Sequence, residues 1–231
     1  CPTRWTVKAD SMIAIINNYE SLKKLWEWSL EKLKDTDMKA RVRGVDAHMQ
    51  RFDFFFGLSL GECLLRNADN LSAGLQTKDL SAEEGKVMAL KTVKAISLMR
   101  TEEAFSLFWQ KVITFAEQRG VDKPCLPRHK RMPARLETGN AEPYYHETPE
   151  GYFRQIYLLA IDHMVNSITD RFDTPDFDMY VNAEQVLIKC IRGDEFEGEL
   201  HAVTTFYRDD FQEDNLRCQL RMISANFESD C

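Results

Sequence analysis

What this sequence lacks excludes several large classes of protein. No apolar run approaches the ~18 to 20 residues that a membrane-spanning helix requires, so we expect no membrane partner. None of the six cysteines forms a Cys-x-x-Cys pair, and no histidine has the spacing of a Cys/His zinc ligand. Glycine-rich phosphate loops and the His-Glu-x-x-His helix are also absent. The residues by themselves therefore predict no bound metal, no cofactor and no complete catalytic chemistry.

The composition is typical of a chain that folds around an apolar core. Hydrophobic residues make up 44% of the 231 residues, enough for one large helical domain or two small ones. The net charge of −7 argues against a protein whose whole surface coats nucleic acid, so any contact with nucleic acid must be local. The widely spaced cysteines favour reduced, packed thiols over disulfides, which indicates an intracellular, reducing compartment.

Apolar residues recur at helical spacing through the first third of the chain. From residue 10 or 11 to about Lys34 they trace one face of a single predicted helix. Asp35-Thr36-Asp37 then predicts a stop followed by a new N-cap. A second helical stretch runs through Val45 towards Leu75, and its glycines are expected to mark bends or restarts. These glycines are Gly44, Gly57 and Gly61.

Capping residues divide the rest of the chain into further helices. Four predicted starts carry a serine or threonine N-cap, and the caps are Ser81, Thr101, Thr148 and Thr174. Arg119-Gly120 predicts the end of the helix that follows Thr101. Gly193 and Gly198 are expected to precede one last helical region that reaches Ile223. Because no convincing strand pair occurs, we predict an all-α fold.

The strongest discontinuity lies between Val121 and Glu147, where four of the seven prolines occur and no apolar period survives. We interpret 121–147 as a basic, proline-rich linker or loop between helical subdomains at 1–120 and 148–231, which we expect to pack together. Its cations either grip a phosphate backbone, serve as an import signal, or form a solvated loop without a partner. The candidate DNA-binding residues of this loop are Lys123, Arg128, Lys130, Arg131 and Arg135.

Two other clusters each have a structural and a functional interpretation. Phe52-Asp53-Phe54-Phe55-Phe56 indicates the centre of a multi-helix core more than a partner-binding patch, with Asp53 facing solvent or capping. The acids between 209 and 214 have the composition of a Mg2+ site, but no apolar strand precedes them to orient the carboxylates. We interpret them as a solvated face. They are Asp209, Asp210, Glu213 and Asp214.

The most informative motif is the amino-terminal sequence Cys1-Pro2-Thr3-Arg4-Trp5-Thr6. A Thr-Arg-Trp triplet that opens a long amphipathic helix resembles the segment where hAT-type DNA transposases, and cellular proteins derived from them, enter the helical insertion of their RNase H-like catalytic domain. Further stretches resemble domesticated vertebrate proteins of this kind, the zinc finger MYM-type or transposase-like proteins. These stretches are 52–58, 69–72, 75–76, 152–157 and 170–173.

Trp5 has two interpretations. On spacing alone, a tryptophan just ahead of a helix is a hydrophobic staple that packs back on the first turn. In hAT transposases the matching tryptophan is associated with stabilising distorted DNA at the cleaved end. The resemblance therefore implies that Trp5 stacks on an exposed base, while Arg4 and Lys8 meet phosphate.

The resemblance implies a nuclear, DNA-associated parent protein of which this chain is the helical insertion alone. The three catalytic acids of the family lie on segments before and after that insertion, so the chain inherits no catalytic residue and we expect it not to be an enzyme. Mg2+ is expected only for an intact, active parent, and oligomerisation only through regions outside this sequence. The alternative is a domesticated helical scaffold that binds proteins and not DNA.

Overall fold

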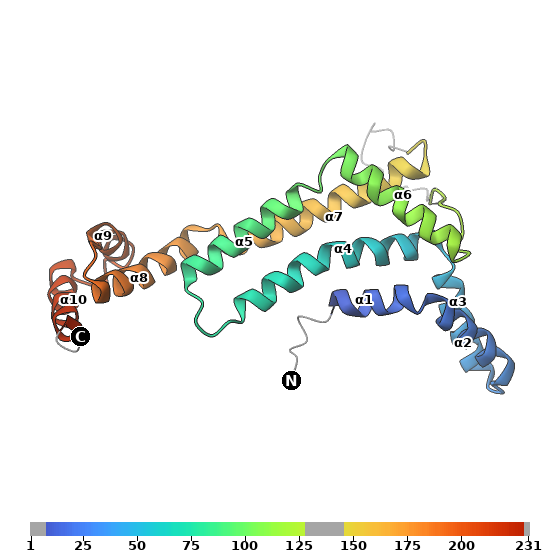
Figure 1. The fold of residues 1–231 in the computed structure, drawn as a ribbon, viewed down its shortest axis with the longest axis horizontal. Helices are drawn as coiled ribbons and strands as arrows, with labels where there is room; N and C mark the ends of the chain where they lie inside the picture. Colours follow the sequence, from blue (N-terminus) through green and yellow to red (C-terminus); the bar gives the residue numbers. More distant parts are fainter. Residues whose placement is uncertain (1–7, 128–145, 229–231) are drawn as a thin grey trace, which may run out of the picture. The chain divides into compact units, whose positions relative to one another are not determined.

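The computed structural model describes residues 8–127 and 146–228, and within these ranges the chain is all-helical (Figure 1). The described residues form ten α-helices and no strand, which confirms the predicted all-α class. The helices are α1 (Lys8–Asn17), α2 (Tyr19–Lys32), α3 (Thr36–Met49), α4 (Phe52–Leu75), α5 (Ala82–Ser97), α6 (Glu102–Gln118), α7 (Pro149–Phe172), α8 (Pro175–Arg192), α9 (Glu197–Phe206) and α10 (Glu213–Glu228).

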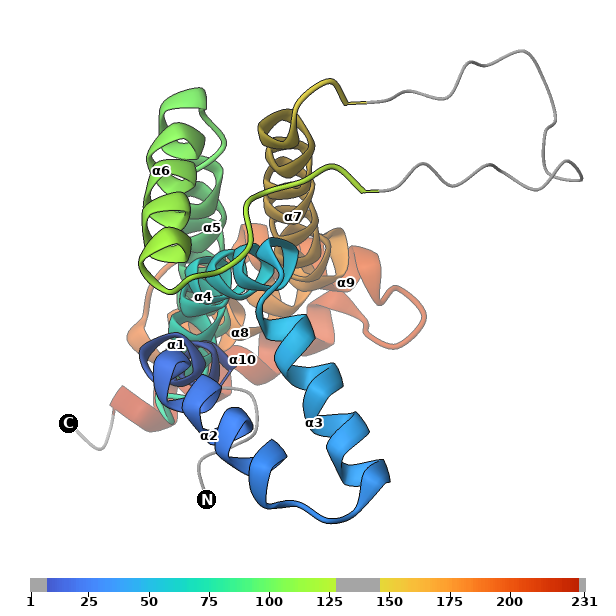
Figure 2. The same cartoon turned by 90° about the vertical axis from the view of Figure 1, so that its right-hand side faces the viewer.

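The prediction of a single helix up to Lys34 is wrong in one respect, because the helix breaks at Asn18 into α1 and α2. Asn18 departs from helical geometry at φ −101° and ψ 14°, and its side-chain amide donates to the Ala14 carbonyl at 2.8 Å. An asparagine that bonds nearby backbone competes with the helical ladder. The break leaves Tyr19 fully buried, with its hydroxyl donating to the Met49 carbonyl, and α2 packs beside α3 as a hairpin (Figure 2).

The next break also lies elsewhere than expected. Gly44, Gly57 and Gly61 all lie inside helices, and the chain instead turns at residues 50–51, between α3 and α4. Gly61 lies at the contact with α1: a Cβ atom there would lie 2.6 Å from Met12 Sδ, so a larger residue would require the end of the Met12 side chain to move. Asp69 of α4 completes this contact by accepting from the Ala9 N–H at 2.9 Å, at the start of α1.

The capping residues behave as the sequence predicts. Asp35 accepts from the Asp37 N–H at 2.9 Å, and Ser81 and Glu84 exchange side-chain bonds with each other's backbone N–H. The threonine caps accept from the N–H three residues later at 3.1 to 3.2 Å. These caps are Thr101, Thr148 and Thr174. Local side-chain chemistry therefore fixes where five of the ten described helices begin.

Aromatic rings fill the core formed by α4, α6 and the first half of α7. The Phe56 and Phe153 ring centroids lie 4.7 Å apart, and Phe52 packs edge-on against Trp109 at 5.5 Å. Tyr157 extends the cluster and donates its hydroxyl to the Met99 carbonyl at 2.9 Å. Ring pairs in such geometry each contribute about 0.5 to 1.5 kcal/mol beyond the area they bury. The predicted core role of the phenylalanine run is confirmed, and Asp53 is exposed beside Arg51.

The three last helices enclose a smaller, aliphatic core. Its buried members are Val186, Cys190, Leu200, Val203 and Leu220. The one last helical region expected from the sequence is in fact two helices, α9 and α10, and Gly198 lies inside α9 instead of preceding it. The residues between them turn back through bonds from the Asp210 and Phe211 N–H groups to the Tyr207 carbonyl, at 3.0 and 3.1 Å.

Contacts group the chain into two compact units, whose borders fall within α4, α5 and α7. We call residues 1–72 and 95–164 the aromatic unit, with 19 acidic and 20 basic residues, and residues 73–94 and 165–231 the acidic unit, with 18 acidic and 10 basic residues. This grouping differs from subdomains at 1–120 and 148–231, because the first half of α7 belongs to the aromatic core.

No helix in the described ranges combines the length and apolarity that crossing a bilayer requires. The four cysteines within those ranges, Cys63, Cys125, Cys190 and Cys218, are free thiols.

Candidate nucleic-acid interface

The structure describes two of the eight residues that we predicted to bind DNA. Lys8 is the exposed first residue of α1, and Lys123 lies in the extended segment after α6. Lys8 does not line the pocket at Lys123, so these two are not brought together there. The other six, Arg4, Trp5, Arg128, Lys130, Arg131 and Arg135, lie outside the described residues.

The segment that leads into the basic loop is fixed at its root. Gly120 adopts φ 62°, which ends α6, and the Val121 N–H donates to the Ala116 carbonyl at 2.9 Å. Val121 is buried, and the Asp122 N–H then donates to the Gln50 carbonyl at 2.8 Å, in the turn between α3 and α4. Lys123 therefore projects from a backbone that is bonded to the aromatic unit.

A small pocket of about 120 Å3 lies beside this root. It is lined by Arg51, Phe52, Asp53, Asp122, Lys123, Cys125, Pro127, Tyr152 and Phe153. Two cations and two carboxylates balance its charge, and the Arg51 Nε atom donates to Asp53 at 3.0 Å. Tyr152 adds a half-buried aromatic ring next to these charges.

The far flank of the loop meets the same pocket residues. The His146 Nε2 atom lies 2.5 Å from Gln155 Oε1, and its ring packs edge-on against Tyr152, with centroids 5.6 Å apart. Tyr152 in turn packs against buried Phe153 at 5.2 Å. Both flanks of residues 128–145 are thus tied to α7 and the α3–α4 turn, within the aromatic unit.

Further cations lie at the end of α6 that leads to this root. Lys23 of α2 donates to the Arg119 carbonyl at 3.2 Å. Lys111 Nζ and the Arg119 guanidinium lie 5.7 and 5.2 Å from the centre of the Phe115 ring. A cation over an aromatic face keeps its charge available at the surface. Because two carboxylates offset the two cations of the pocket, attraction of an anionic chain would depend on the cations near the end of α6 and in the basic loop sequence, with Tyr152 offering a ring for stacking.

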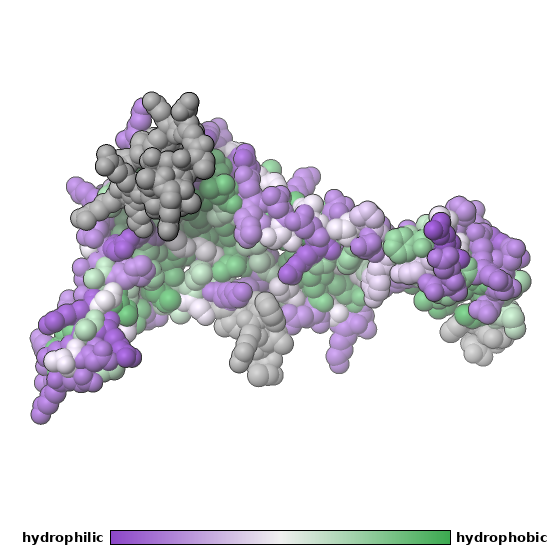
Figure 3. All heavy atoms as spheres, turned by 180° about the vertical axis from the view of Figure 1, so that it is seen from behind, coloured by the Kyte–Doolittle hydropathy of each residue, from purple (hydrophilic) through white to green (hydrophobic). Residues whose placement is uncertain are grey.

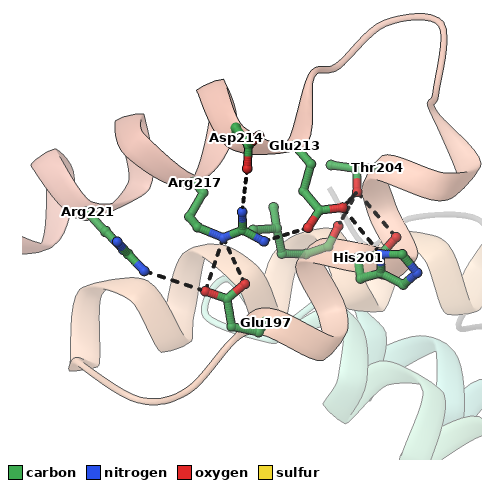
Figure 4. A network of polar contacts seen from close by, with 8 residues as sticks. Glu197, His201, Thr204, Glu213, Asp214, Arg217 and Arg221 are labelled. Carbon is green, nitrogen blue, oxygen red and sulfur yellow. Dashed lines mark hydrogen bonds and ion pairs between the residues drawn. The ribbon is translucent and has the colours of Figure 1, made fainter.

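Of the four acids between 209 and 214, Glu213 and Asp214 form ion pairs within the acidic unit (Figure 4), whereas Asp209 and Asp210 are exposed. Arg217 of α10 binds Glu213 at 2.5 Å, Asp214 at 2.8 Å and Glu197 of α9 at 3.0 Å. Glu213 also contacts His201 at 3.2 Å, and that contact, followed by Arg217, lowers the pKa of the Glu213 carboxyl. Carboxylates that surround a guanidinium in this way join two helices, and the part of the chain that the structure describes has no cluster of three or more metal-ligating side chains.

Two sequence features that resemble catalytic elements have structural roles. Gly57-Leu58-Ser59-Leu60-Gly61 matches the Gly-x-Ser-x-Gly spacing, but a nucleophile elbow is a strand-to-helix turn. Here the segment lies inside α4, and the Ser59 hydroxyl donates to the Phe55 carbonyl at 2.9 Å. In the pocket between α1, α4 and α6, burial raises the pKa of the Cys63 thiol, which disfavours the nucleophilic thiolate.

The sequence did not single out Arg51 or Tyr152. Arg51 lies in the turn between α3 and α4, and Tyr152 immediately precedes the apolar stripe of α7, so only the folded chain places both beside Lys123. Their shared pocket is the strongest geometric link between the basic loop and the described residues. Searches of family models, curated proteins and solved structures find no match to this chain.

Proposed function

We propose that this chain is the helical insertion of a hAT transposase-like protein and that it contacts DNA in its parent protein through its basic loop. The observation that carries the proposal is the fixed root of that loop. Lys123, Arg51 and Tyr152 line one pocket. On one flank of the loop the Asp122 N–H donates to the Gln50 carbonyl, and on the other flank the His146 ring packs on Tyr152. In the sequence, the acid-free run from Lys123 to Arg135 contains four further cations.

Electrostatics support the aromatic unit as the DNA-facing part. Its charges almost cancel, with one more basic than acidic residue, whereas the acidic unit carries eight more acids than bases. A phosphate backbone is attracted by a local excess of cations and repelled by an excess of carboxylates. The basic loop belongs to the aromatic unit, so a local contact there is compatible with the net charge of −7.

The test is a salt titration of binding to a DNA hairpin with unpaired bases at its end. If the loop neutralises phosphates, the affinity falls steeply with salt, with a log–log slope of about −0.9 for each phosphate contacted in a duplex. Replacing the five loop cations by alanine should remove most of that slope. The variant combines Lys123→Ala, Arg128→Ala, Lys130→Ala, Arg131→Ala and Arg135→Ala.

A matched control removes the same charge from exposed cations elsewhere. It combines Lys24→Ala, Lys32→Ala, Lys34→Ala, Arg43→Ala and Lys91→Ala. This control should keep the salt slope of the unaltered chain. Equal losses in the two variants would show that binding is not directed by the loop. No binding at low salt by the unaltered chain would instead favour the protein-interaction scaffold.

Trp5 provides a second test of the same proposal. If Trp5 stacks on an unpaired base, Trp5→Ala should weaken hairpin binding by about 1 to 3 kcal/mol and leave the melting temperature nearly unchanged. If Trp5 is a hydrophobic staple, the substitution should lower the melting temperature and leave DNA affinity alone. Unchanged hairpin affinity in the intact parent protein would contradict the stacking role.

The proposed role is binding without strand cleavage. Two-metal phosphoryl transfer needs carboxylates that hold two ions ~3.5 to 4 Å apart, and in the acidic cluster Glu213 and Asp214 are bound to Arg217. We therefore expect no cleavage of DNA by this chain in Mg2+ or Mn2+. Metal-dependent cleavage that disappears in Asp209→Ala or Asp210→Ala would contradict this part of the proposal.

A further inference from the structure

An apolar groove runs over the three last helices, at a place that the proposed DNA contact does not use. It has a volume of about 600 Å3. We call it the α8–α10 groove, and it is lined by Ala183, Val186, Leu187, Val203, Tyr207, Asp210, Phe211, Leu216 and Leu220. All but one of these residues have apolar or aromatic side chains.

The walls of the groove leave large apolar side chains in water. Leu187 is 54% exposed, Phe211 45% and Tyr207 40%. Val186 and Leu220 at the floor are buried, so the groove rests on the core of the acidic unit. Figure 3 shows apolar side chains of this part of the chain reaching the surface among hydrophilic ones. Exposed side chains that adjoin a preformed apolar floor are typical of a protein-binding surface.

Polar bonds connect the helices and fix the turn that border the groove. The Thr204 hydroxyl donates to the Leu200 carbonyl at 2.9 Å and lies 3.2 Å from Glu213, which joins α9 to the start of α10. The bond from the Phe211 N–H to the Tyr207 carbonyl fixes the turn that carries both rings, whose centroids lie 6.1 Å apart. A partner would therefore meet a surface that is already shaped.

Charge selects the kind of partner. The acidic unit has 18 acidic and 10 basic residues, and its exposed Asp209 and Asp210 lie in the turn at the groove. Two copies of this surface would repel each other, and the surface would also repel the phosphates of nucleic acid. A cationic partner is attracted by the same charges, and electrostatic complementarity raises the rate and specificity of association.

We propose that the α8–α10 groove binds an amphipathic helix of a partner protein, with apolar residues at every third or fourth position on one face and lysine or arginine on the other. The apolar face replaces water on Leu187, Tyr207 and Phe211, in the helix-in-groove mode of recognition. The basic face meets Asp209 and Asp210. This contact is independent of DNA binding by the loop, because the groove lies wholly within the acidic unit.

The test uses an 18-residue synthetic peptide of leucine and lysine in helical periodicity, with a fluorescent label, titrated into the full chain. A second peptide has glutamate at every lysine position, and a third is a scrambled sequence of the first. The helical leucine–lysine peptide should bind, more weakly as salt rises. The glutamate and scrambled peptides should not bind. Equal binding of the leucine–lysine peptide and its scrambled version would show that binding depends on net charge alone and would overturn the proposal.

Substitutions then locate the contact. Leu187→Ser and Phe211→Ser should each weaken binding of the leucine–lysine peptide by about tenfold, which corresponds to 1.4 kcal/mol. Because both residues are half-exposed, the thermal midpoint should barely change. The matched controls are Leu107→Ser and Leu159→Ser, which alter exposed leucines of the aromatic unit and should leave binding unchanged. Equal binding by the groove variants and the unaltered chain would overturn the proposal.

A measurement of mass in solution tests the competing occupant. We expect the chain without peptide to sediment as a species whose mass does not change with Leu187→Ser. A dimer that dissociates in Leu187→Ser would assign the groove to a second copy of the chain and overturn the proposal. The double substitution Asp209→Asn and Asp210→Asn should reduce the salt dependence of peptide binding and keep the apolar contribution.

Discussion

The aromatic unit and the acidic unit reach stability by different means. In the aromatic unit, rings from α4, α6 and α7 pack against each other at centroid distances of about 5 to 6 Å, and the charges of the whole unit nearly cancel. In the acidic unit, a small aliphatic core is joined to a network of carboxylates around Arg217. The comparison indicates that the first unit depends mainly on packing and the second also on charge, so the two should respond to different perturbations.

The largest difference is expected from substitutions in the two cores. Phe56→Ala removes a ring that is 1% exposed and should lower the stability of the aromatic unit by about 3 to 5 kcal/mol. Leu220→Ala should cost the acidic unit about 2 to 4 kcal/mol. All four tryptophans belong to the aromatic unit. The urea midpoint measured by tryptophan fluorescence should therefore fall in Phe56→Ala and not in Leu220→Ala, whereas the unfolding measured by circular dichroism should change in both variants. Identical fluorescence shifts would show that the two units unfold as one.

Alkaline pH should weaken the aromatic unit. Burial raises the pKa of Tyr19 and of Tyr157 to about 12, whereas an unfolded tyrosine titrates near 10. A raised folded pKa gives stability that is fully present below about pH 10 and is lost as pH rises towards 12, by about 2 kcal/mol for each residue. Urea midpoints followed by tryptophan fluorescence from pH 8 to 12 would measure this loss. Tyr19→Phe should flatten the profile, and an unchanged slope in that variant would contradict the assignment.

Acid and salt should weaken the acidic unit. The Glu213 pKa is lowered by His201 and then by Arg217, and the Glu199 pKa is lowered by Lys189. Lowered folded pKa values give stability that is present above the unfolded pKa, about 4.3, and is lost as pH falls through the folded values. In the aromatic unit, Arg100 also lowers the pKa of Asp162. Acid should therefore weaken both units, and we expect the larger loss of stability in the acidic unit.

Arg217→Met tests that contrast. It should lower the thermal midpoint at pH 7 and low salt, because Glu197, Glu213 and Asp214 then lose their shared cation. It should also reduce the difference between pH 7 and pH 3.5. Arg221→Met is the control, since Arg221 is 70% exposed and lies 3.9 Å from Glu197. Equal effects of the two substitutions would mean that the network around Arg217 does not join α9 to α10.

The smallest effect is a difference in thiol reactivity. Exposed Cys125 and Cys218 should react first with iodoacetamide, and half-buried Cys63 more slowly because burial raises its pKa. Cys190 is 1% exposed and its thiol donates to the Leu220 carbonyl, so it should react only when the acidic unit opens. Mass spectrometry of the alkylated peptides gives the order. Reaction of Cys190 as fast as that of Cys125 would contradict the packing of α8 on α10.

The sequence predicts the starts of the capped helices well, because each cap depends on a few adjacent residues. Thr101, Thr148 and Thr174 all cap as expected, and Arg119-Gly120 ends α6. The failures concern positions where tertiary contacts decide. After the break at Asn18, the Tyr19 hydroxyl donates to the Met49 carbonyl at the end of α3. Gly61 does not bend α4 but lies against the Met12 side chain of α1. Neither partner is visible from local sequence.

The candidate interface shows the same limit. Periodicity and charge identify the basic loop and Lys123, because both are properties of adjacent residues. They do not identify Arg51 and Tyr152, which lie far from Lys123 in the chain and meet it only after α3, α4 and α7 have packed. The α8–α10 groove was missed for a related reason. Its apolar residues have the spacing of ordinary core positions, and only the fold reveals that some of them are left in water.

The bonded root of the basic loop has a consequence for engineering the protein. The Asp122 bond to Gln50 and the packing of His146 on Tyr152 secure both sides of residues 128–145 to the aromatic unit. We therefore expect that foreign sequences can be exchanged into that interval while the core residues stay unchanged, since extra length between two fixed points costs little closure entropy. Such chimaeras would turn the helical unit into a carrier on which different nucleic-acid-binding segments are compared against one fixed background.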